Sequence, residues 1–188
     1  MINKNFLDEA SILDMSKEIF NSVVDENLKV ETRFKLLSSK IQEAETINFI
    51  LADGLGFLNL QSTDSYLNEY LNKNVNTTFP SSTNVALTTI AMLKSPVDHG
   101  VIGYYMYDKI NYGLINALNW NEENKNLLLS KYFTSQSSIW KIFKENNIYA
   151  ANFQPKNLID TPLSNFLYEE KSTIPYISHD DLLTTLSD

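Results

Sequence analysis

The 188-residue sequence contains no cysteine. Disulfide frameworks and thiolate metal sites are therefore excluded. A metal ion would have to be bound by carboxylates, hydroxyls or the two histidines, His99 and His179.

Basic residues are also scarce, since Arg33 is the one arginine and the formal net charge is −8. Affinity for a phosphate backbone comes mostly from Lys and Arg, so the composition argues against a general nucleic-acid binder. An anionic substrate would need a metal ion or backbone amides to receive its charge.

Long apolar runs are missing as well. Residues 1–9 contain no apolar stretch of the kind found in a signal peptide, and no run approaches the ~20 residues of a membrane span. The simplest expectation is a cytoplasmic protein without a membrane partner. The oligomeric state is not indicated.

Glycine is rare, and all five glycines lie between Gly54 and Gly113. A chain this poor in glycine places it where the backbone needs a positive φ or a close approach. This window and the residues just before it contain the clearest chemistry: an apolar run that ends in Asp53, a hydroxyl-rich segment over 77–83, and Asp98-His99-Gly100.

Hydrophobic periodicity predicts alternating helices and strands, which favours an α/β sheet with crossover connections. Expected helices cover 5–24, 28–43, 64–72, 84–94 and 139–146, and another begins near 178. Expected strands cover 47–52, 101–107, 114–120 and 148–153, with 47–52 buried on both faces. Ser82 or Thr83 would cap the helix over 84–94, Pro96 would stop it, and 121–134 is a polar surface segment.

Ligands of open α/β sheets bind at the carboxyl ends of strands, where Asp53 is predicted to lie. A carboxylate there can hold a divalent metal, and a metal can lower the pKa of a hydroxyl such as that of Thr78. Simpler interpretations stay open: Asp53-Gly54 is a common turn pair, the hydroxyls can be caps, and His99 is more often a hydrogen-bonded loop residue than a ligand.

The order of these segments resembles the alkaline phosphatase superfamily, and most closely its type I phosphodiesterase and nucleotide pyrophosphatase branch. The matching pieces are the strand ending in Asp53-Gly54, the Thr78-Phe79-Pro80 turn, the following helix, and Pro96 before His99-Gly100. Residues 104–108, 138–143 and 153–155 fit the same branch, so the resemblance covers about 47–165.

The resemblance implies a three-layer α/β sandwich with a mostly parallel central sheet, and a hydrolase of phosphodiester or pyrophosphate bonds that acts on a small phosphoester or nucleotide. It implies two divalent metal ions, usually zinc, with Asp53 as a ligand and Thr78 as both ligand and nucleophile. The expected organisation is one domain over 1–188, with a helical lead-in (1–45), a phosphodiesterase-like core (46–165) and the start of a continuation (166–188).

The sequence also departs from the family pattern. A Thr-Gly pair expected after the nucleophile helix is absent at 91–95, and Tyr104 stands where many relatives have a phosphate-contacting Asn. Ser81, Ser82 or Thr83 could replace Thr78 as nucleophile if the turn is shifted. Related phosphomonoesterase, phosphonoacetate-hydrolase or sulfatase branches are weaker matches.

In the family, an Asp-x-x-x-His pair, an Asp-His pair and a final His come later as metal ligands. This set is not found downstream of His99-Gly100 in this chain, where His179-Asp180 has the reversed order. The sequence is therefore expected to be the N-terminal part of an enzyme and to be inactive alone. The alternative is a non-catalytic α/β fragment or pseudoenzyme that lacks the second half of the metal site.

Overall fold

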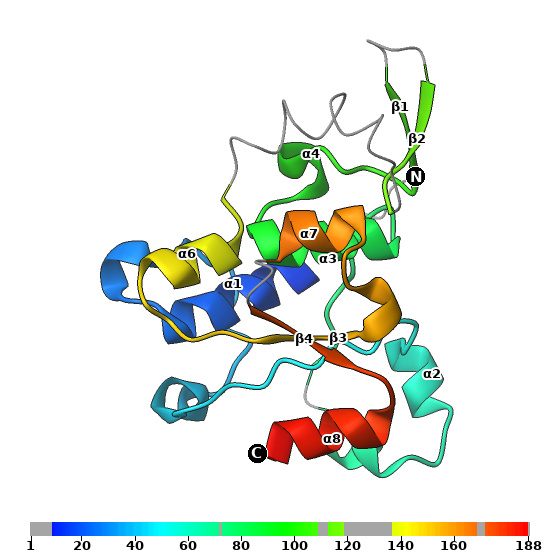
Figure 1. Cartoon of the computed structure of the whole chain (residues 1–188). Coiled ribbons are helices and arrows are strands. Elements are labelled where there is room, and N and C mark those ends of the chain that lie inside the picture. The colour runs from blue at the N-terminus through cyan, green and yellow to red at the C-terminus, as the bar shows by residue number, and fades with distance from the viewer. Residues whose placement is uncertain (1–8, 72, 109–112, 119–136, 169–171, 188) are drawn as a thin grey trace. The chain divides into compact units, whose positions relative to one another are not determined.

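The computed structural model describes residues 9–71, 73–108, 113–118, 137–168 and 172–187. The chain forms two compact units, Met1–Thr77 and Thr78–Asp188, and each is described by itself. Figure 1 shows the order of the elements along the chain.

The first unit is built from short helices joined by extended segments. Its elements are α1 (Ile12–Val23), α2 (Phe57–Gln61) and three 3₁₀ turns, η2 (Glu26–Leu28), η3 (Ser39–Glu43) and η4 (Tyr66–Tyr70). A single parallel bridge joins Ser11 to Asn76, where Ile12 N donates to Asn76 O at 2.8 Å.

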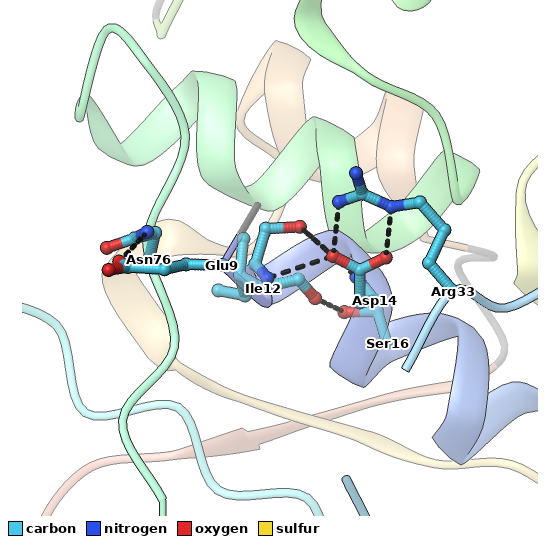
Figure 2. A network of polar contacts seen from close by, with 7 residues as sticks. Glu9, Ile12, Asp14, Ser16, Arg33 and Asn76 are labelled. Carbon is cyan, nitrogen blue, oxygen red and sulfur yellow. Dashed lines mark hydrogen bonds and ion pairs between the residues drawn. The ribbon is translucent and has the colours of Figure 1, made fainter. Parts of the chain in front are cut away.

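Helix α1 begins where Ser11 and Asp14 cap each other. Figure 2 shows Asp14 together with its partner Arg33. Ser11 N donates to Asp14 Oδ2 at 2.9 Å, and Asp14 N donates to Ser11 Oγ at 3.3 Å. Arg33 Nη2 also donates to Asp14 Oδ2, at 3.0 Å. Burial alone would raise the pKa of Asp14, but the hydrogen bonds from Arg33 and Ser11 outweigh it and hold this pKa below its usual value. The predicted helix over 5–24 is thus confirmed from Ile12 to Val23, and residues 5–8 lie outside the described chain.

The helix predicted over 28–43 is wrong. Residues 29–38 are non-helical, and only η3 follows. Side chains of α1 explain this, because Glu18 accepts hydrogen bonds from the backbone N–H groups of Leu36 and Leu37 at 2.8 and 2.7 Å. Asn21 likewise accepts from Val30 N and donates to Val30 O. These contacts satisfy the backbone in an open conformation, so a helix is not needed.

The buried strand predicted over 47–52 is also wrong. These residues form no ladder with another described strand, and Phe49, Ile50 and Leu51 are 40, 80 and 45% exposed. An apolar run becomes a strand only when a neighbouring strand takes up its backbone hydrogen bonds. The apolar composition of residues 47–52 was therefore not sufficient to predict a buried strand.

The second unit has a hydrophobic core between helices and a hairpin. Helix α3 (Thr83–Met92) contacts α7 (Pro162–Leu167), and the core contains the buried residues Val85, Ala91, Met92, Val101, Met106, Ile115, Ala117, Leu163 and Leu167. Met106 and Ile115 reach this core from paired positions of β1 (Tyr105–Asp108) and β2 (Gly113–Asn116), which are antiparallel. The hairpin therefore turns one face to the core.

A second small sheet pairs β3 (Asn152–Pro155) with β4 (Thr173–Tyr176) in parallel. Parallel strands need a crossover, which here contains η6 (Lys156–Leu158) and α7. The remaining helices are α4 (Pro96–His99), α6 (Ile139–Glu145) and α8 (His179–Ser187). The structure is a mixed α/β arrangement with small sheets, and it does not confirm a three-layer sandwich.

Most other predicted elements of this unit are confirmed with shifted ends. Helices over 84–94, 139–146 and near 178 correspond to α3, α6 and α8, and strands over 101–107 and 114–120 correspond to β1 and β2. The strand predicted over 148–153 shares only residues 152–153 with β3, because residues 148–151 are not in a strand. Pro96 does not stop α3, which ends at Met92, but begins α4. Helices α2 and α7 and strand β4 were not predicted, and the predicted surface segment 121–134 lies outside the described residues. Within the described chain, no helix combines the length and apolar character needed to cross a bilayer.

Candidate active site

Asp53 lies in a tight turn of the first unit. Leu55 N donates to Ala52 O at 3.3 Å, and Gly54 has a φ of 76°, a value that favours glycine. Asp53 is exposed. The turn predicted from Asp53-Gly54 is confirmed, but Asp53 does not lie at the carboxyl end of a strand as predicted, because residues 47–52 form no strand.

Thr78 begins the second unit, in the extended segment before α3. Only 8% of the residue is exposed, and its Oγ1 donates to Pro80 O at 2.9 Å. The intervening Phe79 is 83% exposed, and the Phe79–Pro80 peptide bond is cis. The Thr78 hydroxyl is thus held by its own turn, while its oxygen lone pairs are not used by that hydrogen bond.

The alternative nucleophiles lie between this turn and the first turn of α3. Ser81 is exposed, and Ser82 is the residue before the helix. Ser82 Oγ donates to Asn84 Oδ1 at 2.8 Å, and Asn84 Nδ2 donates to Gly103 O at 2.8 Å. Asn84 is fully buried. Its two hydrogen bonds join the start of α3 to the segment before β1. Thr83 is the first helical residue and is half-buried.

His99 ends α4 and is 1% exposed. Its Nδ1 accepts a hydrogen bond from Val101 N at 3.1 Å, so the neutral ring carries its proton on Nε2, which lies 2.9 Å from Thr89 Oγ1. Burial lowers the pKa of His99 to about 4, although nearby Asp98 opposes this shift. Both ring nitrogens are engaged within the unit. The expected hydrogen-bonded histidine is confirmed, in a helix rather than a loop.

A family model described as type I phosphodiesterase / nucleotide pyrophosphatase matches residues 49–186. The chain belongs to this family. The family is part of the alkaline phosphatase superfamily, as the order of the motifs had indicated. No curated protein and no solved structure matches the chain.

Type I phosphodiesterases and nucleotide pyrophosphatases hydrolyse phosphoester bonds of small or nucleotide substrates, and they are typically metal-dependent. Membership of this family therefore indicates the class of reaction, which is phosphodiesterase- or pyrophosphatase-type hydrolysis. The match includes both Asp53 and Thr78.

The donor set described in this chain is too small for the metal centre of that family. Across the described ranges, no three His, Asp or Glu side chains gather where they could hold a metal ion. Asp53 and Thr78 offer one carboxylate and one hydroxyl, His99 is engaged on both nitrogens, and His179 is exposed at the start of α8.

Asn84, at the start of α3, is a polar residue whose contacts sequence reasoning missed. Its position in the second residue of a helix gives no sign that both ends of its amide are used. The signal that could have identified Asn84 was its position among the buried residues of α3, next to Val85 and one helical turn before Thr88.

Proposed function

We propose that the chain is a metal-dependent hydrolase of phosphodiester or pyrophosphate bonds in which Thr78 is the nucleophile. The match to the family over residues 49–186 carries this proposal. It is supported by the position of Thr78, whose turn leads directly into the N-terminus of the ten-residue helix α3. The N-terminal end of a helix favours negative charge, as on a phosphoester.

In this proposal the Thr78 oxygen attacks phosphorus, its hydroxyl proton passes to solvent, and the leaving group departs with the electrons of its own P–O bond and takes up a proton from water. A water oxygen then bonds to the phosphorus of the phosphothreonine, the P–O bond to Thr78 breaks, and a proton of that water restores the Thr78 hydroxyl. The hydrogen bond from Thr78 Oγ1 to Pro80 O fixes the hydroxyl in its turn before the reaction. Ser82 is hydrogen-bonded to Asn84, and Asn84 joins the start of α3 to Gly103.

We further propose Asp53 and Thr78 as ligands of divalent metal, with zinc as the first candidate. Carboxylate and hydroxyl oxygens are suitable donors, and the exposed position of Asp53 in its turn supports access. Zinc binding measured by equilibrium dialysis should weaken in Asp53→Asn, and an unchanged zinc affinity would remove Asp53 from the ligand set.

For the whole family domain we propose the alkaline-phosphatase-like three-layer sandwich. The parallel β3–β4 pair and its helical crossover support it, because such units build parallel sheets. An experimental structure with β3 and β4 isolated from any larger sheet would contradict this architecture.

The nucleophile is tested by zinc-dependent cleavage of an aryl phosphodiester by the full chain. Absolute turnover is expected to be low, since the described donor set is small, so the informative quantity is the ratio between variants. Thr78→Ala should lower any zinc-dependent rate to background, because loss of a nucleophile removes the covalent route. Thr77→Ala, at the exposed neighbouring residue, is the matched control and should keep the wild-type rate.

Two further variants locate the nucleophile if the turn is shifted. Thr78→Ser retains a hydroxyl and should keep part of the activity, whereas Ser81→Ala and Ser82→Ala should retain most of it. Full activity in Thr78→Ala, with loss in Ser81→Ala or Ser82→Ala, would move the nucleophile to that serine.

The second candidate function is a non-catalytic module that binds a phosphoester or nucleotide without turnover. The lack of a three-residue metal cluster in the described part of the chain favours it. Its signature would be calorimetric binding of a nucleoside monophosphate without zinc-dependent cleavage in the wild-type chain.

A further inference from the structure

A small polar pocket in the second unit lies where the β3–β4 sheet meets α7. Its volume is about 20 Å³. The lining residues come from both strands, from α7 and from the turns beside it: Gln154, Ile159, Asp160, Ser164, Asn165, Tyr168 and Thr173. None of them belongs to the turn of Thr78 or to the residues around His99, so the pocket is separate from the candidate active site.

Gln154 supplies the observation that points to a ligand. The residue is 8% exposed, and its Oε1 is buried and accepts no hydrogen bond from a described residue. A buried acceptor without a donor is unfavourable, and native proteins avoid it or satisfy it with water. Gln154 is also hydrogen-bonded to the side chain of Tyr168, and because Oε1 has no partner, this contact uses the amide nitrogen.

Other polar groups of the same pocket can complete a binding site. Burial raises the pKa of Tyr168 to about 12, with the hydrogen bond from Gln154 opposing the shift, so the tyrosine keeps its hydroxyl proton at neutral pH. With Gln154 donating to the Tyr168 oxygen, that proton can be given to a third group. Ser164, on α7, and Thr173, on β4, add hydroxyls from two more elements.

Size and charge restrict the ligand. A volume of about 20 Å³ is close to the ~10–15 Å³ that one water molecule requires, and a buried water makes about three hydrogen bonds. Asp160 adds a carboxylate to the lining, which favours a donor over an anion. We propose that this pocket binds one hydrogen-bond donor of the size of water, either water itself or an ammonium ion, which donates to Gln154 Oε1 and links β3, β4 and α7.

The alternative is a dry pocket, and the two cases predict opposite signs for one substitution. Gln154→Met keeps the size of the side chain and removes its polar atoms. If Oε1 is truly without a donor, this change relieves an unfavourable burial and stabilises the fold. If Oε1 has a bound donor, the change removes a hydrogen bond and destabilises it.

The contact between Gln154 and Tyr168 must be removed from this comparison. We therefore place Gln154→Met in a Tyr168→Phe background and compare the urea midpoint of the double variant with that of Tyr168→Phe alone. Trp140, whose ring lies 5.5 Å from that of Tyr168, reports unfolding by fluorescence. We expect a lower midpoint for the double variant, and an equal or higher midpoint would overturn the proposal.

A second measurement uses the wild-type chain and does not depend on the folding of the variants. The side-chain amide of Gln154 should show a nuclear Overhauser effect to a bound water or ammonium ion with a lifetime above nanoseconds. Absence of this effect for both species would contradict the proposal.

A comparison of two salts distinguishes bound water from a bound ammonium ion. Urea midpoints are compared in ammonium chloride and sodium chloride at equal ionic strength. A rise specific to ammonium that Gln154→Met abolishes identifies the ammonium ion. Equal midpoints in the two salts, together with the lower midpoint of the double variant, identify water.

Discussion

His99 shows what a single buried histidine contributes at the scale of one residue. Its Nδ1 accepts from Val101 N, and its Nε2 lies within hydrogen-bond distance of Thr89 Oγ1. Protonation would place a second N–H on Nδ1, directly facing the N–H of Val101. Two donors would then meet in a buried site, which agrees with the lowering of the pKa of His99 to about 4.

This arrangement predicts acid sensitivity. The pKa of His99 is about 4 in the folded chain against a usual 6.5, so the unfolded state takes up a proton first as the pH falls. The contribution of neutral His99 to the free energy of unfolding is complete above pH 6.5. It is lost as the pH falls from 6.5 to about 4. The free energy of unfolding should therefore fall by about 2 kcal/mol between pH 7 and pH 5, measured by urea titration.

The control separates His99 from the other histidine. His99→Gln should flatten the pH dependence in this range, while His179→Gln, at an exposed position, should keep the wild-type slope. Equal slopes in the wild type and in His99→Gln would show that another group causes the acid sensitivity.

Residue by residue, sequence reasoning identified which side chains were chemically notable but not what they contact. The turn at Asp53-Gly54 followed from glycine chemistry, and it is confirmed. The hydrogen bond of Thr78 to Pro80, and the double contact of Asn84 with Ser82 and Gly103, depend on tertiary placement. No local pattern encodes such contacts. The roles of Asp53 and Thr78 stay predictions.

At the scale of elements, prediction succeeded where local signals agree with tertiary packing. Helix α3 has a buried face with Val85 and Met92, and α8 begins after Ser178, whose Oγ accepts from Asp181 N. Prediction failed where tertiary contacts override periodicity. Glu18 holds the backbone of Leu36 in the segment predicted as a helix, and the 47–52 run has no described strand partner.

Helix α7 was missed because it is only six residues long and begins at Pro162, after Thr161, in a polar stretch. Thr161 caps it, since its hydroxyl accepts from Ser164 N at 3.3 Å, and Pro162 occupies its first position. Leu163 and Leu167 fix it to the core. The stability of so short a helix comes from this packing rather than from its own hydrogen bonds.

The packing of α7 can be tested with one substitution. Leu167 is fully buried in the core, so Leu167→Ala should lower the free energy of unfolding by about 2–5 kcal/mol through lost burial and a cavity. The same change at Leu183, 62% exposed on α8 of the same unit, should cost less than about 0.5 kcal/mol. Urea unfolding followed by tryptophan fluorescence compares the two. Similar losses in both variants would show that α7 is not anchored by the core.

At the scale of the whole molecule, apolar side chains are exposed in a segment whose composition predicted a buried strand. The run predicted to be buried lies on the surface of the first unit, and the exposure continues into the next turn and helix. Its members are Phe49, Ile50, Leu51, Leu55 and Leu58, from 40 to 80% exposed. Contiguous exposed apolar residues favour association with another surface.

This surface predicts concentration-dependent self-association. The average mass measured by sedimentation should rise with protein concentration, because contact between two copies removes these side chains from water. Replacing Ile50 and Leu58, which are 80 and 76% exposed, with lysine should raise the dissociation constant at least about tenfold, since ~1.4 kcal/mol of lost burial suffices for that change. Val97→Lys is the matched control, because Val97 is 87% exposed in the other unit and should leave the dissociation constant unchanged. A mass independent of concentration in the wild-type chain would show that this apolar segment does not drive association, whatever its exposure.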